Sequence, residues 1–160
     1  MQLHGVLQKG PKVDKIYCAP GNAGIAEYAE CADIGAMEFE KLAAFAKEKE
    51  IDLTIVGMDD PLVGGIVDVF EAEGLRVFGP RKNAAILEGS KAFSKDLMKN
   101  MIFLQLLMRI LMIRKSSGIF KNRGKFPIVL KADGLALGKG VLICQDLAEA
   151  EAGDKRDHGR

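Results

Sequence analysis

Short apolar runs alternate with amphipathic stretches over the first half of the chain, and this alternation restricts the possible folds more than any other feature. Three runs have the length and composition of strands, and a turn residue or proline ends each: Lys15–Ala19, Asp52–Gly57 and Leu75–Gly79. Apolar residues at helical spacing predict helices between them, at Ala36–Lys49 and Leu62–Glu73. Gly74 is placed to end the second helix. Strands joined in this way form a parallel sheet, so the sequence predicts an α/β fold with Asp52–Gly57 buried on both faces.

The charge balance excludes one class of partner. The 160 residues hold 23 Lys and Arg against 22 Asp and Glu, so the net charge is +1. A protein that tracks a nucleic-acid backbone needs a surplus of basic residues, so we expect no nucleic-acid partner.

The cysteines and histidines offer no metal site. The three cysteines share no C-x-x-C spacing, and we expect them to be buried thiols in a reducing compartment. The two histidines, His4 and His158, form no zinc motif.

No segment of the sequence predicts a membrane-spanning helix or a signal peptide. The most apolar run, Met101–Ile113, is shorter than the roughly 20 residues of a spanning helix, and the N-terminus lacks the pattern of a signal peptide. We therefore expect a cytoplasmic protein with no membrane partner.

Three loops follow the predicted strands and form a candidate site: Pro20–Gly24, Met58–Pro61 and Gly79–Pro80. Ligands of doubly wound sheets gather at the carboxyl ends of strands, and glycines there let a phosphate approach the backbone. The alternative is ordinary turn chemistry. No G-x-G-x-x-G motif follows a strand, so an NAD enzyme is unsupported.

Ser90 is placed to cap a helix that carries two lysines on one face. Lys91 and Lys95 are four residues apart, which gives them the same side of the helix. The alternative is a plain solvated face.

Residues Ile128–Ile143 predict a strand, a glycine-rich loop and a second strand. The spacing from Gly134 to Gly138 and the strand that follows do not match a Walker A loop, which runs into a helix. A hairpin that covers phosphates fits better, since Lys139 and the loop N–H groups could cap phosphate oxygens while Lys131 points a charge from the strand beneath. The alternative is a mobile hairpin tip.

Five segments together resemble the phosphoribosylamine-glycine ligase (glycinamide ribonucleotide synthetase) family of the ATP-grasp superfamily. They are A-P-G-N-A-G-I at Ala19–Ile25, D-L-T-I-V-G with P-L-V at Asp52–Val63, F-G-P at Phe78–Pro80, L-E-G-S-K-A-F-S-K at Leu87–Lys95 and I-V-L-K-A-D-G-L-A-L-G-K-G-V at Ile128–Val141. The resemblance implies a Rossmann-like domain at residues 1–90 and the beginning of an ATP-grasp domain at residues 91–160.

The resemblance also implies an activity and a set of binding residues. Members of the family phosphorylate the carboxylate of glycine with ATP, and the amine of 5-phosphoribosylamine then displaces the phosphate. Contacts with ATP are implied for eight residues: Lys91, Lys95, Lys131, Asp133, Gly134, Gly138, Lys139 and Gly140. Contacts with the ribosylamine phosphate are implied for Asn22, Gly24, Asp60, Pro61 and Leu62. The carboxylate and Asn ligands of Mg²⁺ would lie beyond the end of the chain, and no catalytic residue is assigned within it.

The sequence departs from the family pattern in three places. Residues Met1–Gly10 lack the first strand and its glycine-rich turn, and we expect the helix after that strand to be missing too. The chain stops before the expected metal ligands. Within Asn100–Lys125, where the family has an extended Ile-Pro-Thr-Ala segment, residues Met101–Ile113 are apolar on every side. A codon choice exists for which a two-base shift restores that segment, so we hypothesise a frameshift there and similar origins for Met1–Gly10 and Glu151–Arg160.

Two other functions stay open at this point. One is a different ATP-grasp enzyme, such as a carboxylase or another purine ligase. The other is a non-catalytic nucleotide-binding or structural remnant.

Overall fold

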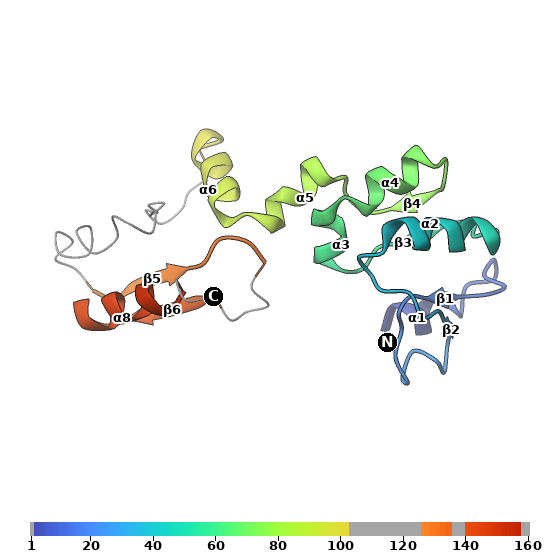
Figure 1. The fold of residues 1–160 in the computed structure, drawn as a ribbon, viewed down its shortest axis with the longest axis horizontal. Coiled ribbons are helices and arrows are strands. Elements are labelled where there is room, and N and C mark those ends of the chain that lie inside the picture. Colours follow the sequence, from blue (N-terminus) through green and yellow to red (C-terminus); the bar gives the residue numbers. More distant parts are fainter. Residues whose placement is uncertain (1, 103–125, 136–139, 158–160) are drawn as a thin grey trace. The chain divides into compact units, whose positions relative to one another are not determined.

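The computed structural model describes residues 2–102, 126–135 and 140–157 (Figure 1). The chain divides into two compact units, Met1–Ala85 and Ile86–Arg160. Each unit combines helices with a two-stranded sheet or sheets, which confirms the α/β class. Among the described helices, none combines the length and the hydropathy that a membrane span requires.

The first unit contains two pairs of parallel strands. β1 (Tyr17–Cys18) pairs with β2 (Glu30–Cys31), and β3 (Thr54–Ile55) pairs with β4 (Val77–Phe78). The three predicted strands all form, but each is short. The alternation did not predict β2, because its two residues are both exposed.

The two pairs do not join into the single sheet that the alternation predicts. A doubly wound sheet has the strand order 3-2-1-4-5-6. If the two pairs are fitted to that order, β2 and β1 correspond to its third and second strands, and β3 and β4 to its fourth and fifth. None of the described strands corresponds to its first strand. Thr54 and Val56 donate their N–H groups to the C=O groups of Arg76 and Phe78, so the backbone groups of Ile55 face the other edge of β3, where no described strand pairs with it. β3 is therefore only half-buried, and Leu53 beside it is 46% exposed, so the prediction of burial on both faces was wrong.

The N-terminal residues form a helix, α1 (Gln2–Leu7), rather than a strand. The expectation that no helix would be found here was therefore wrong.

The core of the first unit lies between α2 (Phe39–Glu48) and α4 (Ile66–Ala72). The buried residues come from one face of each helix: Ala43, Ala46, Ile66, Val67 and Phe70. Half-buried side chains from β4 and from the segments beside β3 and β4, Val77, Val56 and Leu75 among them, complete this cluster.

The predicted helix Leu62–Glu73 is two helices. α3 (Asp59–Gly64) ends at Gly65, whose φ of +102° lies in the left-handed region, and α4 begins directly after it. Residues with a side chain rarely adopt this conformation, and Gly adopts it freely. The helical spacing of the apolar residues continues across the break, so the periodicity alone did not reveal it.

α2 and α4 both end in Schellman motifs. After α4, Leu75 N–H donates to Phe70 C=O (2.9 Å) and Gly74 N–H to Glu71 C=O (3.0 Å), with Gly74 at φ +73°. This confirms the predicted role of Gly74. After α2, Ile51 N–H donates to Ala46 C=O (2.9 Å), but the left-handed residue is Glu50, at φ +51°.

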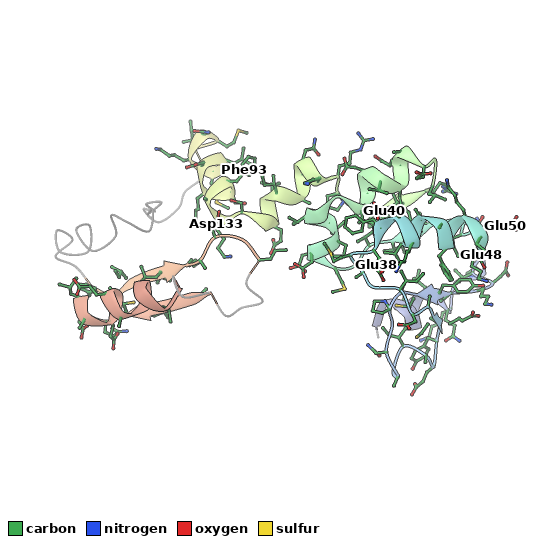
Figure 2. The ribbon with its side chains drawn as sticks, viewed as in Figure 1. Glu38, Glu40, Glu48, Glu50, Phe93 and Asp133 are labelled. Carbon is green, nitrogen blue, oxygen red and sulfur yellow. The ribbon has the colours of Figure 1, made fainter. Side chains whose placement is uncertain are left out.

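Replacing Glu50, labelled at the end of α2 in Figure 2, by glycine should stabilise the first unit. The left-handed conformation costs a residue with a Cβ about 1–2 kcal/mol, part of which the greater backbone freedom of unfolded glycine offsets. We therefore expect Glu50→Gly to raise the free energy of unfolding by about 0.5–1 kcal/mol, measured by urea titration. Ala44→Gly, at an exposed position inside α2, should lower it by about 1 kcal/mol. A loss of stability in both variants would contradict this account of the helix end.

The second unit begins within α5 (Lys82–Gly89) and contains α6 (Lys91–Asn100), the hairpin β5 (Ile128–Lys131) and β6 (Val141–Cys144), and α8 (Leu147–Asp157). The strands are antiparallel, with Ile128 opposite Cys144 and Lys131 opposite Val141, so the predicted hairpin is confirmed. Cys144 of β6 and Ala150 of α8 are the buried members of the hydrophobic cluster in this unit, and they pack against Ile128, Leu130 and Leu142. α8 therefore covers one face of the hairpin.

Candidate functional site

The turn after β1 is organised around Asn22. Its side-chain Oδ1 accepts a hydrogen bond from Ile25 N–H (3.1 Å), and its C=O accepts from Ile25 N–H and Ala26 N–H (3.0 Å each). The amide of Asn22 therefore caps the turn, which holds Gly24 at a fixed place beside it. Both residues are at least partly open to solvent, so the turn can still receive a ligand.

The segment Asp60–Leu62 lies in α3. Asp60 is exposed, whereas Pro61 is buried and Leu62 packs against the core of the first unit. A Cβ added to Gly79 would lie 2.8 Å from Leu62 Cδ2, so the loops after β3 and β4 touch. Asp60 is therefore the side chain of this segment that is most open to a substrate.

The structure brings two of the three predicted loops together. The loops after β3 and β4 share one edge because the strands are parallel, with Ile55 opposite Phe78. The described hydrogen bonds of Asn22, by contrast, all lie within residues 22–31. No described hydrogen bond connects the turn after β1 with the other two loops.

In the second unit, Asp133 binds the start of α6. Its Oδ1 accepts a hydrogen bond from Ala92 N–H (3.1 Å), and its Oδ2 accepts from the Ser90 hydroxyl (3.0 Å). Ser90 Oγ in turn accepts from Phe93 N–H (3.1 Å), which confirms Ser90 as the N-cap. Figure 2 labels Asp133 and Phe93 near this end of α6. The carboxylate occupies the place that an anion would take at this helix N-terminus.

The hydrogen bonds lower the pKa of Asp133. Donation from Ala92 N–H is the largest cause, and burial opposes it. A carboxyl whose pKa is lower in the folded state stabilises the fold above its unfolded pKa of about 3.9. This stabilisation is lost as the pH falls through the lowered value.

Removing this carboxylate should loosen the second unit. We expect Asp133→Ala to lower its free energy of unfolding by about 1–2 kcal/mol at pH 7, the usual cost of losing a helix cap. Asp133→Asn keeps an oxygen acceptor for Ala92 N–H and should lose less. Urea titrations at pH 7 and pH 3 measure both effects, and the difference between wild type and Asp133→Ala should shrink at pH 3. An equal difference at the two pH values would show that the carboxylate charge contributes nothing.

Lys91 contacts the segment that follows Asp133. Its Nζ donates to Gly134 C=O (2.5 Å). Gly134 has φ +85°, and a Cβ added there would meet no atom of the described residues within 4 Å. The left-handed backbone favours glycine here. Lys95 is half-buried on the same helix.

The outer face of the hairpin is apolar and ends in a lysine. Alternation along the strands turns Val129 (53% exposed), Val141 (43%) and Ile143 (64%) away from α8. Lys131 ends β5 on the same face, opposite Val141. Lys131 was predicted from the sequence, whereas the three apolar residues beside it were not. The period-2 pattern of both strands, combined with their register, would have revealed them.

The remaining residues expected to bind ATP lie around the hairpin loop. Gly140 is buried, and its C=O accepts a hydrogen bond from Ala132 N–H (2.9 Å), which closes the base of the hairpin. Gly138 and Lys139 lie outside the described residues. The hypothesised frameshift at Asn100–Lys125 lies almost wholly outside them as well.

The described residues do not fit a Mg²⁺ site. Mg²⁺ requires several oxygen ligands in octahedral geometry, and nowhere in the described ranges do three His, Cys, Asp or Glu side chains cluster. Asp133, the acidic side chain that follows β5 at the glycine-rich end of the hairpin, is engaged by α6.

Two family models match consecutive parts of the chain. The N domain of phosphoribosylglycinamide synthetase matches residues 2–88, and its ATP-grasp (A) domain matches residues 89–155. The chain is 48% identical over 145 residues to the phosphoribosylamine-glycine ligase of Caldanaerobacter subterraneus, and 50% identical over 145 residues to that of Brucella melitensis. These alignments cover 91% and 90% of the chain but 35% and 34% of the relatives. The chain therefore spans about a third of the length of the curated relatives it matches.

Solved structures agree with these matches. The crystal structure of phosphoribosylamine-glycine ligase from Thermotoga maritima superimposes with a TM-score of 0.69 at 29% identity, over 95% of this chain and 36% of that one. The biotin carboxylase domain of Hydrogenobacter thermophilus 2-oxoglutarate carboxylase, solved with MgADP, ADP and bicarbonate, superimposes with a TM-score of 0.64 at 20% identity, over 82% of this chain and 30% of that one. At that identity the second likeness concerns the fold alone.

Proposed function

Because this chain belongs to the phosphoribosylglycinamide synthetase family, we propose that it carries part of the ATP site and part of the ribosylamine site of a ligase in purine biosynthesis. The ligase joins glycine to 5-phosphoribosylamine at the expense of ATP. Relatives with 48% and 50% identity bear the name of this ligase, which favours it over a carboxylase. The substrates are small molecules, and the expected location is the cytoplasm.

The outer face of the hairpin carries this proposal. A nucleotide has an apolar, planar base at one end and a polyanion at the other. Val129, Val141 and Ile143 offer exposed apolar surface, and Lys131 offers a positive charge at the edge of that surface. The base would lie on the apolar side chains, and the phosphates would extend toward Lys131 and the backbone of Gly134, where no atom of the described residues meets an added Cβ.

Asp133 has a different role from the phosphate contact that the resemblance implies. Its carboxylate accepts hydrogen bonds from Ala92 and Ser90, and a carboxylate repels a phosphate. We assign to it the positioning of the hairpin base against α6. Lys91 strengthens the same connection through Gly134 C=O, so a contact between Lys91 and a phosphate would require this hydrogen bond to open.

The chemistry of the ligase divides between this chain and residues outside it. ATP, when bound, supplies the phosphoryl group that activates the glycine carboxylate. Lys131 holds negative charge in place at the end of β5, and the capped turn at Asn22 and Gly24 binds the phosphate of the amine substrate through its backbone. Mg²⁺ has no site among the described residues, and its ligands are expected outside this chain.

The contribution of the Lys131 charge to ATP affinity tests this proposal most directly. We expect Lys131→Ala to weaken ATP binding by about tenfold or more, equivalent to about 1.4 kcal/mol, because a charge fixed on a strand needs no ordering when the ligand arrives. Isothermal titration of the full chain with ATP measures the affinity.

Two controls accompany this titration. Lys139→Ala should weaken binding less, since the sequence places Lys139 in a loop that binding must order. Lys99→Ala, in the last turn of α6, removes the same charge elsewhere and should leave the affinity unchanged. Equal losses in Lys131→Ala and Lys99→Ala would overturn the placement of the phosphates.

A further inference from the structure

Cys18 and Cys31 lie directly opposite each other on neighbouring parallel strands. Cys18 ends β1, Cys31 ends β2, and the register pairs their Cα atoms. Adjacent strands are about 4.8 Å apart, which lies within the Cα separation of about 4.4–6.8 Å that disulfides span. Paired residues of two strands also point to the same face of the sheet.

The two thiols differ in access, and the third thiol is separate. Cys31 is exposed, Cys18 is half-buried, and Cys144 is buried in the second unit. The expectation of three buried cysteines was therefore wrong. Burial raises the pKa of Cys18, and the neighbouring Cys31 raises it further. A reagent in solution consequently meets Cys31 first.

Cys31 also touches the turn that Asn22 caps. Its Sγ lies 3.8 Å from Asn22 C=O, and a Cβ added to Gly21 would overlap this sulfur. Gly21, at φ +75°, gives the thiol its space. The segment between the two cysteines contains the whole turn, so a covalent link between Cys18 and Cys31 would close that turn into a ring.

We propose that Cys18 and Cys31 form a dithiol modification site that a small-molecule disulfide oxidises to an intrachain disulfide. The Cys31 thiolate attacks one sulfur of the reagent, which forms a mixed disulfide and releases one thiolate. The Cys18 thiolate then attacks Cys31 Sγ and expels the second thiolate. Two protein thiols lose two electrons and two protons, and the reagent is reduced to two thiols. This site stands independently of the ligase function.

Oxidised glutathione is the probe for this site. After incubation with the folded full-length chain, the number of free thiols should fall from the three of the sequence to one. Both cysteines lie in one tryptic peptide, residues 16–41, which should lose two hydrogen atoms in mass without gaining glutathione. The same reaction in urea measures the rate at which the disulfide forms in the unfolded chain, where the two cysteines are close only in sequence. We expect the disulfide to form about tenfold faster or more in the folded chain.

Single variants identify each step. Cys144→Ser should still form the link, whereas Cys18→Ser should accumulate a stable mixed disulfide at Cys31. Cys31→Ser should react much more slowly at Cys18. The proposal is overturned if the wild-type chain keeps glutathione on Cys31, if the link involves Cys144 or a second chain, or if folding does not accelerate the reaction.

Discussion

Incubated with glycine, ATP and 5-phosphoribosylamine, this chain alone should form no detectable glycinamide ribonucleotide. Positioning of reactants can lower a barrier by roughly 7–11 kcal/mol, and the ligase needs three substrates held together. The chain spans about a third of its curated relatives, and the described residues contain no cluster of metal ligands. ATP binding should survive where turnover does not. A product assay against a no-protein control measures turnover.

A chimera with a full-length relative tests the reason for the expected lack of turnover. The full-length relative from Caldanaerobacter subterraneus, assayed in parallel, is the positive control. A chimera should regain turnover if it carries that relative's residues for the first strand, for the segment at Asn100–Lys125 and for the part beyond residue 160. Product above the control from the chain alone would show that the missing elements are not needed. An inactive chimera that folds and binds ATP would show that the described part itself departs from the ligase.

Phe70→Ala should unfold the first unit. Phe70 is 1% exposed and has the largest fully buried side chain among the described residues, and it packs in a cluster with four other buried residues. Truncating a buried phenylalanine costs about 3–5 kcal/mol, which is comparable to the whole stability of a small domain. We expect the unfolding transition of this unit to disappear or to shift to very low urea concentration.

Phe78→Ala makes the same chemical change at a surface position. Phe78 lies in β4 and is 69% exposed, so its removal should change stability by less than about 1 kcal/mol. Circular dichroism during urea titration compares the two variants. Equal losses would mean that the cluster around Phe70 is not the stabilising core of this unit.

Local signals in the sequence determined several elements correctly. Ser90 caps α6 and Gly74 ends α4 as expected, because caps depend on a few neighbouring residues. The hairpin formed by β5 and β6 followed from two apolar strands and the glycines between them. The family also followed from the sequence, because its motifs are contiguous stretches of residues.

Tertiary structure alone decided how these elements meet. The break at Gly65 interrupts an unbroken helical pattern, and only the backbone conformation reveals it. The sequence predicted a single sheet. The structure forms two separate pairs of strands instead, and none of the described strands pairs with both β1 and β3.

The candidate sites depend on contacts between residues far apart in the chain. The resemblance implied a contact between Asp133 and ATP but gave no sign that its carboxylate accepts hydrogen bonds from the start of α6, more than forty positions earlier in the chain. The apolar face beside Lys131 and the pairing of Cys18 with Cys31 both depend on strand register. A sequence determines which side chains alternate along one strand. Which of them lie opposite one another is decided by backbone hydrogen bonds between strands and by packing of the covered face, and these form only in the folded chain.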